Sequence, residues 1–259
     1  MDTTHWPIDI SAQPVDLDKN VVLVTGAAGG IGSSVCLACA AAGATVVMLD
    51  KNQRGLNRVY DQIMAENYPE PVQVVDDLAK MRTENFDVLT DQVLQEFKKL
   101  DGLVHCAATS APLTPMQLCS PEIFESVLQV NVTSAWQLTR STLIALQESS
   151  NACVVFCSGE PGRKGEAYWN ASAVSWAAID SMARTWHQEL ETNSNIRIYS
   201  LDPGAVNSPM RTRLFPAENP SMIHSTEEVA RACTWLMSQN ASNVREVMLR
   251  YEHGILRQS

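Results

Sequence analysis

Short runs of apolar, β-branched residues alternate along the chain with longer segments whose apolar residues recur at helical spacing. The short runs predict seven strands, at residues 21–25, 45–49, 72–75, 102–106, 154–157, 197–201 and 247–249. Between the first two, Ile31, Val35 and Cys39 share one face of a helix that Gly43 ends. Strands that alternate with helices are typical of a parallel sheet covered on both faces.

The same pattern predicts one α/β domain over residues 1–259. Two long helical segments, 121–148 and 171–191, follow the fourth and fifth strands, and the sequence contains no internal repeat or low-complexity linker. We expect a doubly wound parallel sheet of about seven strands with helices on both faces. Residues 1–19 would form an N-terminal extension, and prolines in 205–225 predict a loop over the carboxyl edge of the sheet, where such folds bind ligands.

Composition narrows the classes of partner and the compartment. The 19 basic and 29 acidic residues give a net charge of −10, which disfavours nucleic acid and anionic membranes. Without an apolar run of membrane-spanning length or a signal peptide, the chain is expected in the cytoplasm. Cys36 and Cys39 lie in a helical stretch and favour core packing. The histidines His105, His187 and His224 show no ligand spacing, so no metal site is predicted.

A glycine-rich turn follows the first strand directly and opens the first helix: Thr25-Gly26-Ala27-Ala28-Gly29-Gly30-Ile31-Gly32. Gly26 would permit the tight turn, Gly30 would let a pyrophosphate approach the backbone, and Gly32 would let the helix pack closely on the strand. Free N–H groups at the helix start, from Gly30 through Ile31 to Gly32, would face the phosphates. The alternative is a purely structural turn.

The spacing T-G-x-x-x-G-I-G resembles the signature of the short-chain dehydrogenase/reductase family, and other landmarks extend the resemblance from about residue 20 to 251. The resemblance implies a Rossmann-type fold that binds NAD(H) or NADP(H). Asp50 ends the second strand, where an acid can bind the ribose diol and repel the phosphate of NADP, so NAD is favoured, although Lys51 could soften the repulsion. Asp77-Leu78 resembles the family's pair at the adenine ring, and Asp76 leaves the register open by one residue.

Two further segments resemble family motifs around the cofactor. His105-Cys106-Ala107-Ala108 occupies the place of N-N-A-G, and only Ala107 matches. Pro203-Gly204-Ala205-Val206-Asn207-Ser208-Pro209-Met210 resembles P-G-x-V-x-T-x-M, whose threonine helps to hold the nicotinamide amide. Pro203, Gly204 and Ser208 are therefore expected at the cofactor, although Ser208 could equally be a turn residue before proline.

The family's catalytic set is a serine, a tyrosine, a lysine four residues after it, and an asparagine. With Tyr168 as the tyrosine, Ser172 takes the lysine position and Val155 the serine position, so that alignment fails twice. Aligning Ser175-Trp176-Ala177-Ala178 with the family's S-K-A-A puts Gly159 at the serine, Ser172 at the tyrosine and Trp176 at the lysine. Only Asn131 is retained, and it could simply be a polar helix residue.

An aliphatic hydroxyl at Ser172 is a poorer acid than a phenol, and Trp176 supplies no cation. Loss of a positioned acid or base typically costs about 10²- to 10⁴-fold in rate. We therefore interpret the chain as a dinucleotide-binding pseudo-oxidoreductase with a sensing or interaction role. One alternative is an active NAD(P)-dependent oxidoreductase of alcohols or carbonyls that uses Tyr168 and Ser158, with Lys164 as the cation. A second is a cofactor-free scaffold.

The resemblance also implies an oligomer, because the two long helices pair across subunit interfaces in the family. Trp136, Trp176 and Trp186 lie on these helices, and tryptophan suits such surfaces. A homodimer or homotetramer is expected.

Overall fold

A nine-stranded sheet runs through the computed structural model, which describes residues 6–259. Its spatial order is β1-β9-β8-β7-β6-β5-β2-β3-β4. The strands are β1 (Ile8–Asp9), β2 (Val21–Thr25), β3 (Thr45–Asp50), β4 (Val72–Val75), β5 (Gly102–His105), β6 (Cys153–Cys157), β7 (Arg197–Asp202), β8 (Met248–Glu252) and β9 (Ile255–Gln258). From β4 to β8 all neighbours are parallel, as predicted.

The expectation of about seven strands was too low by two. β9 pairs antiparallel with β8, and β1 pairs antiparallel with β9, so the sheet gains an antiparallel edge. β1 is only two residues long, and β9 has the sequence Ile-Leu-Arg-Gln, which carries little apolar signal. β1 lies within the predicted extension 1–19, where Ile10 and Leu17 are almost fully buried against the core.

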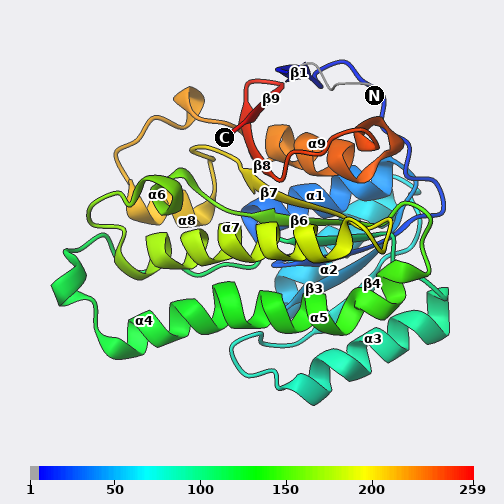
Figure 1. Ribbon diagram of the computed structural model, residues 1–259, viewed down its shortest axis with the longest axis horizontal. Helices are drawn as coiled ribbons and strands as arrows, with labels where there is room; N and C mark the ends of the chain where they lie inside the picture. The colour runs from blue at the N-terminus through cyan, green and yellow to red at the C-terminus, as the bar shows by residue number, and fades with distance from the viewer. Residues whose placement is uncertain (1–5) are drawn as a thin grey trace.

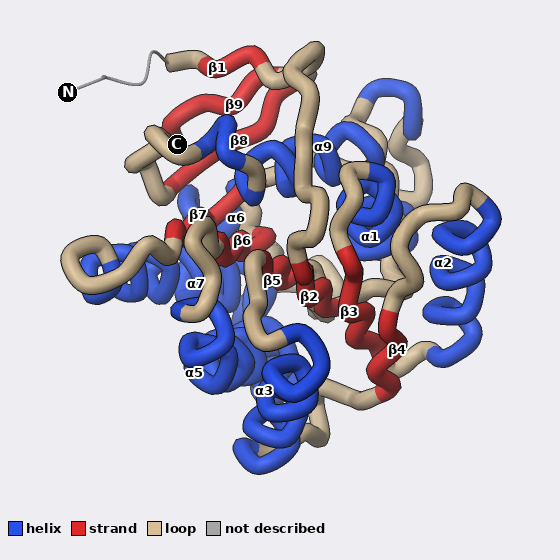
Figure 2. Tube along the Cα trace, turned by 90° about the vertical axis from the view of Figure 1, so that its right-hand side faces the viewer, coloured by secondary structure: helices blue, strands red, loops and turns tan. Residues whose placement is uncertain are grey.

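Helices cover both faces of the sheet (Figures 1 and 2). Helices α1, α2 and α9 pack on one face, and α3, α5 and α7 pack on the other. The helices are α1 (Gly30–Ala41), α2 (Gln53–Ala65), α3 (Thr83–Phe97), α4 (Pro121–Leu128), α5 (Ser134–Gln147), α6 (Glu160–Lys164), α7 (Asn170–Leu190), α8 (Pro209–Leu214) and α9 (Thr226–Met237). Short 3₁₀ turns occupy Met116–Leu118, Pro220–Met222 and Gln239–Ala241.

The central strands form the core because both of their faces are covered. All five residues of β2 and all six of β7 are buried, as expected for parallel strands between two helical layers. Cys36 and Cys39 are fully buried in α1, and burial raises the pKa of both thiols. Their predicted role in core packing is confirmed.

The predicted helix 121–148 is interrupted once. A π-helical turn at Gln129–Thr133 separates α4 from α5. Such turns insert an extra residue and often occur at functional sites. Asn131 lies within this turn, and its side chain is buried.

The segment 205–225 folds over the carboxyl edge of the sheet and contains α8. It is closed by a parallel bridge between Val206 and His224. Of the helices in the described part of the chain, none combines the length and apolar character that a membrane crossing needs.

Candidate functional site

A cavity of about 970 Å³ opens at the carboxyl edge of the sheet. Its walls come from the glycine turn before α1, the ends of β3 through β7, the start of α6, and the segment 205–225. Of the predicted cofactor residues, all line this cavity: Gly26, Gly30, Ile31, Gly32, Asp50, Asp77, Leu78, Ala107, Pro203, Gly204 and Ser208. Motifs that span about 180 residues of the sequence therefore line one continuous cavity.

Two glycines of the turn are required by close backbone packing. Gly26 has φ +65°, and a Cβ there would lie 2.7 Å from the Ala107 backbone. A Cβ on Gly32 would lie 2.1 Å from the Gly26 carbonyl oxygen. Real Cβ atoms do not approach other atoms so closely, so each position excludes a side chain.

The first helix presents its N-terminus to the cavity. Gly29 caps α1 without a side-chain hydrogen bond, and Gly30 and Ile31 line the cavity. Unsatisfied N–H groups and the positive end of the helix dipole favour an anion there. A Cβ on Gly30 would lie 3.0 Å from the side chains of Ser208 and Pro209, so the segment 205–225 packs directly against the turn.

Ser208 begins α8 as its N-cap, and its hydroxyl accepts a hydrogen bond from the Arg211 N–H at 3.3 Å. The turn role left open for Ser208 is therefore present. Its hydroxyl also borders the cavity.

Side chains of both signs surround the predicted adenosine end. The Asp50 carboxylate accepts hydrogen bonds from the N–H groups of Ala28 (3.1 Å) and Asn52 (2.8 Å). Exposed Lys51 and Arg58 line the same wall. The charges available to a ribose or to a ribose phosphate are therefore mixed.

Asp77 and Leu78 lie where the family's adenine pair was predicted. Asp77 is 3.9 Å from the Lys51 ammonium and 3.8 Å from that of Lys80. Leu78 is buried and lines the cavity with both Asp76 and Asp77. Whichever aspartate matches the family's pair, it therefore lies on the same wall of the cavity.

The end of β5 departs from the family pattern without losing its backbone contacts. Ala107 donates its N–H to the Thr25 hydroxyl at 3.1 Å. His105 is buried, lies 2.9 Å from the Thr139 hydroxyl through Nε2, and stacks on Phe156 at 4.7 Å. Burial lowers the pKa of His105 to about 3, so the ring is neutral and structural.

Trp176 lines the cavity on the side where the nicotinamide is predicted. A Cβ on Gly159 would lie 3.2 Å from the indole ring of Trp176, and one on Gly162 would lie 2.6 Å from the Trp176 Cβ. Trp169 packs against the same indole, with ring centroids 5.3 Å apart. The predicted serine position, Gly159, and the predicted lysine position, Trp176, are thus in close contact.

Ser172 has a structural role. It is 1% exposed, and its hydroxyl accepts a hydrogen bond from the Ala111 N–H at 3.0 Å. Asn131 likewise holds backbone, because its side chain accepts from the Thr109 N–H (2.8 Å) and donates to the Thr109 carbonyl (3.0 Å). It also donates to the Ser175 hydroxyl at 2.9 Å.

The two alternative catalytic residues are not brought together. Tyr168 is 60% exposed, has φ 72°, and is not among the described residues that line the cavity. Ser158 lines the cavity but is 5% exposed, with its hydroxyl 3.4 Å from the Trp176 carbonyl. The Lys164 ammonium is 2.6 Å from Glu160.

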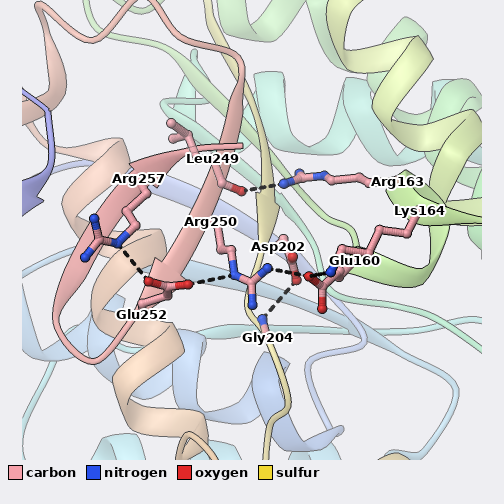
Figure 3. Close-up of polar contacts among 9 residues, drawn as sticks. All are labelled: Glu160, Arg163, Lys164, Asp202, Gly204, Leu249, Arg250, Glu252 and Arg257. Atoms are coloured by element: carbon pink, nitrogen blue, oxygen red, sulfur yellow. Dashed lines mark hydrogen bonds and ion pairs between the residues drawn. The ribbon is translucent and has the colours of Figure 1, made fainter. Parts of the chain in front are cut away.

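A charged group that sequence reasoning missed lies beside these positions (Figure 3). Arg250 lies 2.6 Å from the Glu160 carboxylate and 3.1 Å from that of Glu252. Lys164 and Arg250 lower the pKa of Glu160 through hydrogen bonds. Asp202 is buried, and one carboxylate oxygen accepts the Gly204 N–H at 2.9 Å. Asp202 directly precedes the Pro203-Gly204 motif, so the sequence could have pointed to it. Arg250 lies on β8, which is distant in the sequence.

Comparison with known proteins agrees with this geometry. The short chain dehydrogenase family matches residues 20–219. The oxidoreductase YciK of Escherichia coli is 31% identical over 225 residues, which cover 87% of this chain and 88% of that protein.

Solved structures of similar proteins have the same architecture. A short chain dehydrogenase from Pseudomonas syringae has a TM-score of 0.89 and 36% identity, over 93% of this chain and 98% of that one. One from Shigella flexneri, complexed with NADP, has a TM-score of 0.85 and 30% identity, over 89% and 96%. One from Escherichia coli, complexed with NADPH, has a TM-score of 0.87 and 29% identity, over 92% and 98%. The predicted preference for NAD finds no support in these complexes. From its fold, its glycine turn and the match across its length, this chain belongs to the short chain dehydrogenase family.

Proposed function

We propose that this protein binds a nicotinamide dinucleotide in the cavity without the family's hydride transfer, and serves as a sensing or interaction protein. The observation that carries the proposal is the contact between Trp176 and Gly159. A Cβ at position 159 would lie 3.2 Å from the indole, so a serine and the present tryptophan compete for one space.

Reduction of a carbonyl needs a proton as well as the hydride that a bound dinucleotide supplies. A general acid must reach the carbonyl oxygen and have a pKa near the working pH. Ser172 is buried and engaged with the Ala111 N–H. Glu160 is held as a carboxylate by Lys164 and Arg250, which lower its pKa. Neither group is suited to donate a proton at neutral pH.

The cofactor itself is proposed as NAD(H) or NADP(H). The relatives complexed with NADP and NADPH support the phosphorylated form, as do Lys51 and Arg58 on the cavity wall. Asp50 opposes it, because a carboxylate repels a ribose phosphate.

The experiment screens alcohols and carbonyls with both cofactors in the wild type and in a restored variant. Gly159→Ser, Ser172→Tyr and Trp176→Lys together rebuild the family's set, and removal of the indole makes room for the new hydroxymethyl group at position 159. We expect binding without turnover in the wild type. Turnover should appear in the triple variant, by about 10²-fold or more above background.

Wild-type turnover that Tyr168→Phe abolishes would overturn the proposal and favour the active enzyme. Binding is measured separately, from tryptophan fluorescence and melting temperature, since a ligand of the native state raises apparent stability. If millimolar NADH and NADPH change neither, the cofactor-free scaffold would replace the proposal. A folded triple variant that binds but stays inactive would show that the loss lies elsewhere.

We also propose a homo-oligomer in the cytoplasm. Trp136 is 45% exposed on α5 and remains a candidate interface residue. Trp186 is partly buried on α7. Trp176 lines the cavity and is better assigned to the site than to an interface. Sedimentation of the wild type and of Trp136→Glu tests this proposal; an unchanged monomer in both would exclude it.

A further inference from the structure

Three side chains that can bind a metal meet at the far end of the segment 205–225. His224, Glu228 and His253 each offer a nitrogen or carboxylate oxygen, and these atoms lie within 4.8 Å of one another. His224 ends the segment, Glu228 lies in the first turn of α9, and His253 lies in the turn between β8 and β9. Three separate parts of the chain thus contribute two imidazoles and one carboxylate.

His224 is fixed and has an unsatisfied nitrogen. Its residue is 9% exposed, and its Nδ1 is buried without a hydrogen-bond partner among residues 6–259. A buried polar group left unpaired costs about 1–3 kcal/mol. The ring is held edge-on against Tyr251 (5.1 Å) and His253 (4.6 Å). A partner for this nitrogen would remove the cost.

Burial favours the uncharged form of the His224 ring. Burial, and then the neighbouring His253, lower the pKa of His224, and Arg250 acts in the same direction. Glu228 and Glu252 act against them. A neutral imidazole is the form that binds a metal.

The other two side chains are less buried than His224. One Glu228 oxygen accepts the Ser225 N–H at 2.7 Å in a capping box, and a carboxylate can bind a metal through its other oxygen. His253 is exposed and lies in a left-handed turn with φ 46°. Neither is confined by burial as His224 is.

We propose that His224, Glu228 and His253 form a binding site for a divalent transition-metal ion, with zinc as the best fit. Two imidazoles and one carboxylate suit zinc, at about 2.0–2.2 Å from each ligand atom, with an open position for water. Tetrahedral ligands at that range are about 3.4 Å apart, so the cluster must close by about 1 Å. Calcium and magnesium prefer oxygen ligands and fit this set less well.

Such an ion would stabilise the part of segment 205–225 that lines the proposed dinucleotide cavity. The His224 N–H donates to the Ala205 carbonyl at 2.9 Å, and its carbonyl accepts the Asn207 N–H at 2.8 Å. A Cβ on Gly204 would lie 3.2 Å from the His224 ring, and Gly204 and Ala205 line the cavity. The ion would join this wall to α9 and to the β8–β9 hairpin, which adjoin each other in Figure 1.

The test titrates zinc chloride into the metal-free full chain by calorimetry and follows the melting temperature. His253→Asn keeps a residue that tolerates a left-handed turn, and Glu228→Gln keeps the capping box, so both variants should fold. The matched control is His187→Asn, because His187 has Glu191 one turn away at 3.9 Å but belongs to no three-ligand cluster among the described residues.

We expect one zinc per chain, a raised melting temperature, and binding weakened at least about tenfold in both cluster variants, since even outer-shell changes cost about 10- to 100-fold. His187→Asn should bind as the wild type does. Cobalt(II) should give visible d–d bands without a thiolate charge-transfer band, which separates this site from the seven cysteines. No stoichiometric binding, binding unchanged in the cluster variants, or a thiolate band would each overturn the proposal.

Discussion

The two ends of the cavity are built from the same sheet edge, yet they depend on the sequence in different ways. At the glycine turn, Gly26 and Gly32 are required because an added Cβ would lie 2.7 and 2.1 Å from neighbouring backbone atoms. At the nicotinamide end, Gly159, Ser172 and Trp176 pack well without any of the family's reactive groups. The fold itself therefore requires the glycine turn, whereas the positions of the family's catalytic side chains are occupied here by residues that pack without reactive groups. Close packing is therefore sufficient to explain why the turn is intact.

The largest effect should follow from disrupting the glycine turn. Gly32→Ala puts a Cβ where the Gly26 carbonyl lies 2.1 Å away, and the helix must move off the strand. We expect a loss of about 3 kcal/mol or more in the free energy of unfolding, at the upper end for overpacking. Denaturant unfolding measures it.

Gly165→Asn is the matched control. Gly165 has a positive φ, +65°, which Gly32 does not, and a Cβ there would meet nothing within 4 Å. Asparagine tolerates this conformation, so a loss under about 1 kcal/mol is expected. Equal losses in the two variants would mean that close packing at Gly32 is not the cause of a large loss.

The stability of the fold should depend on pH through buried His105. Burial lowers its pKa to about 3, below the unfolded value of about 6.5. The native state therefore binds fewer protons, so the contribution is complete above pH 6.5 and is lost as the pH falls toward 3. Between pH 7.5 and 5 the loss should reach about 2 kcal/mol.

His105→Asn removes this proton linkage and restores the amide that the family pattern has there. We expect the stability difference between wild type and variant to shrink by about 2 kcal/mol between pH 7.5 and 5. Paired unfolding curves at the two values measure it, and the shared contribution of His224 cancels. A constant difference would mean that folding does not shift the pKa of His105.

The same contrast explains what could be predicted from the sequence. The parallel strands and the glycine turn were predicted correctly because each is a local pattern, such as the buried run Val21–Thr25. The strand β1 was missed because two residues carry no period. Asp202, Arg250 and Glu160 meet only through the pairing of β7 with β8 and the placement of α6, and His224, Glu228 and His253 meet only through segment 205–225 and the last hairpin. Contacts between distant segments leave no local spacing to detect.

Trp176→Lys tests whether the indole blocks the nicotinamide end of the cavity. The variant should tighten dinucleotide binding by about tenfold, or about 1.4 kcal/mol. Because a lysine side chain is narrower than an indole, the variant reopens the space for the nicotinamide ribose, and the new ammonium group can bind the ribose hydroxyls. Trp176→Leu makes room without the cation, so a gain shared by both variants would identify space as the cause. Fluorescence of bound NADH and NADPH measures it. Unchanged or weaker binding in the lysine variant would count against a blocked subsite.

The smallest effect should come from Asp50, where charge and not shape distinguishes the cofactors. Asp50→Asn removes the repulsion of a ribose phosphate and leaves Lys51 and Arg58 on the wall, so the affinity for NADPH relative to NADH should rise about fivefold, or about 1 kcal/mol. Asp61→Asn, on the exposed side of α2, makes the same change in net charge outside the cavity and should leave the ratio unaltered. Because both cofactors share the adenosine and pyrophosphate contacts, their ratio isolates the 2′ position from any general change in binding. An unchanged ratio in Asp50→Asn would mean that the ribose does not reach this carboxylate, and the turn that binds the phosphates would then have to be sought at another register.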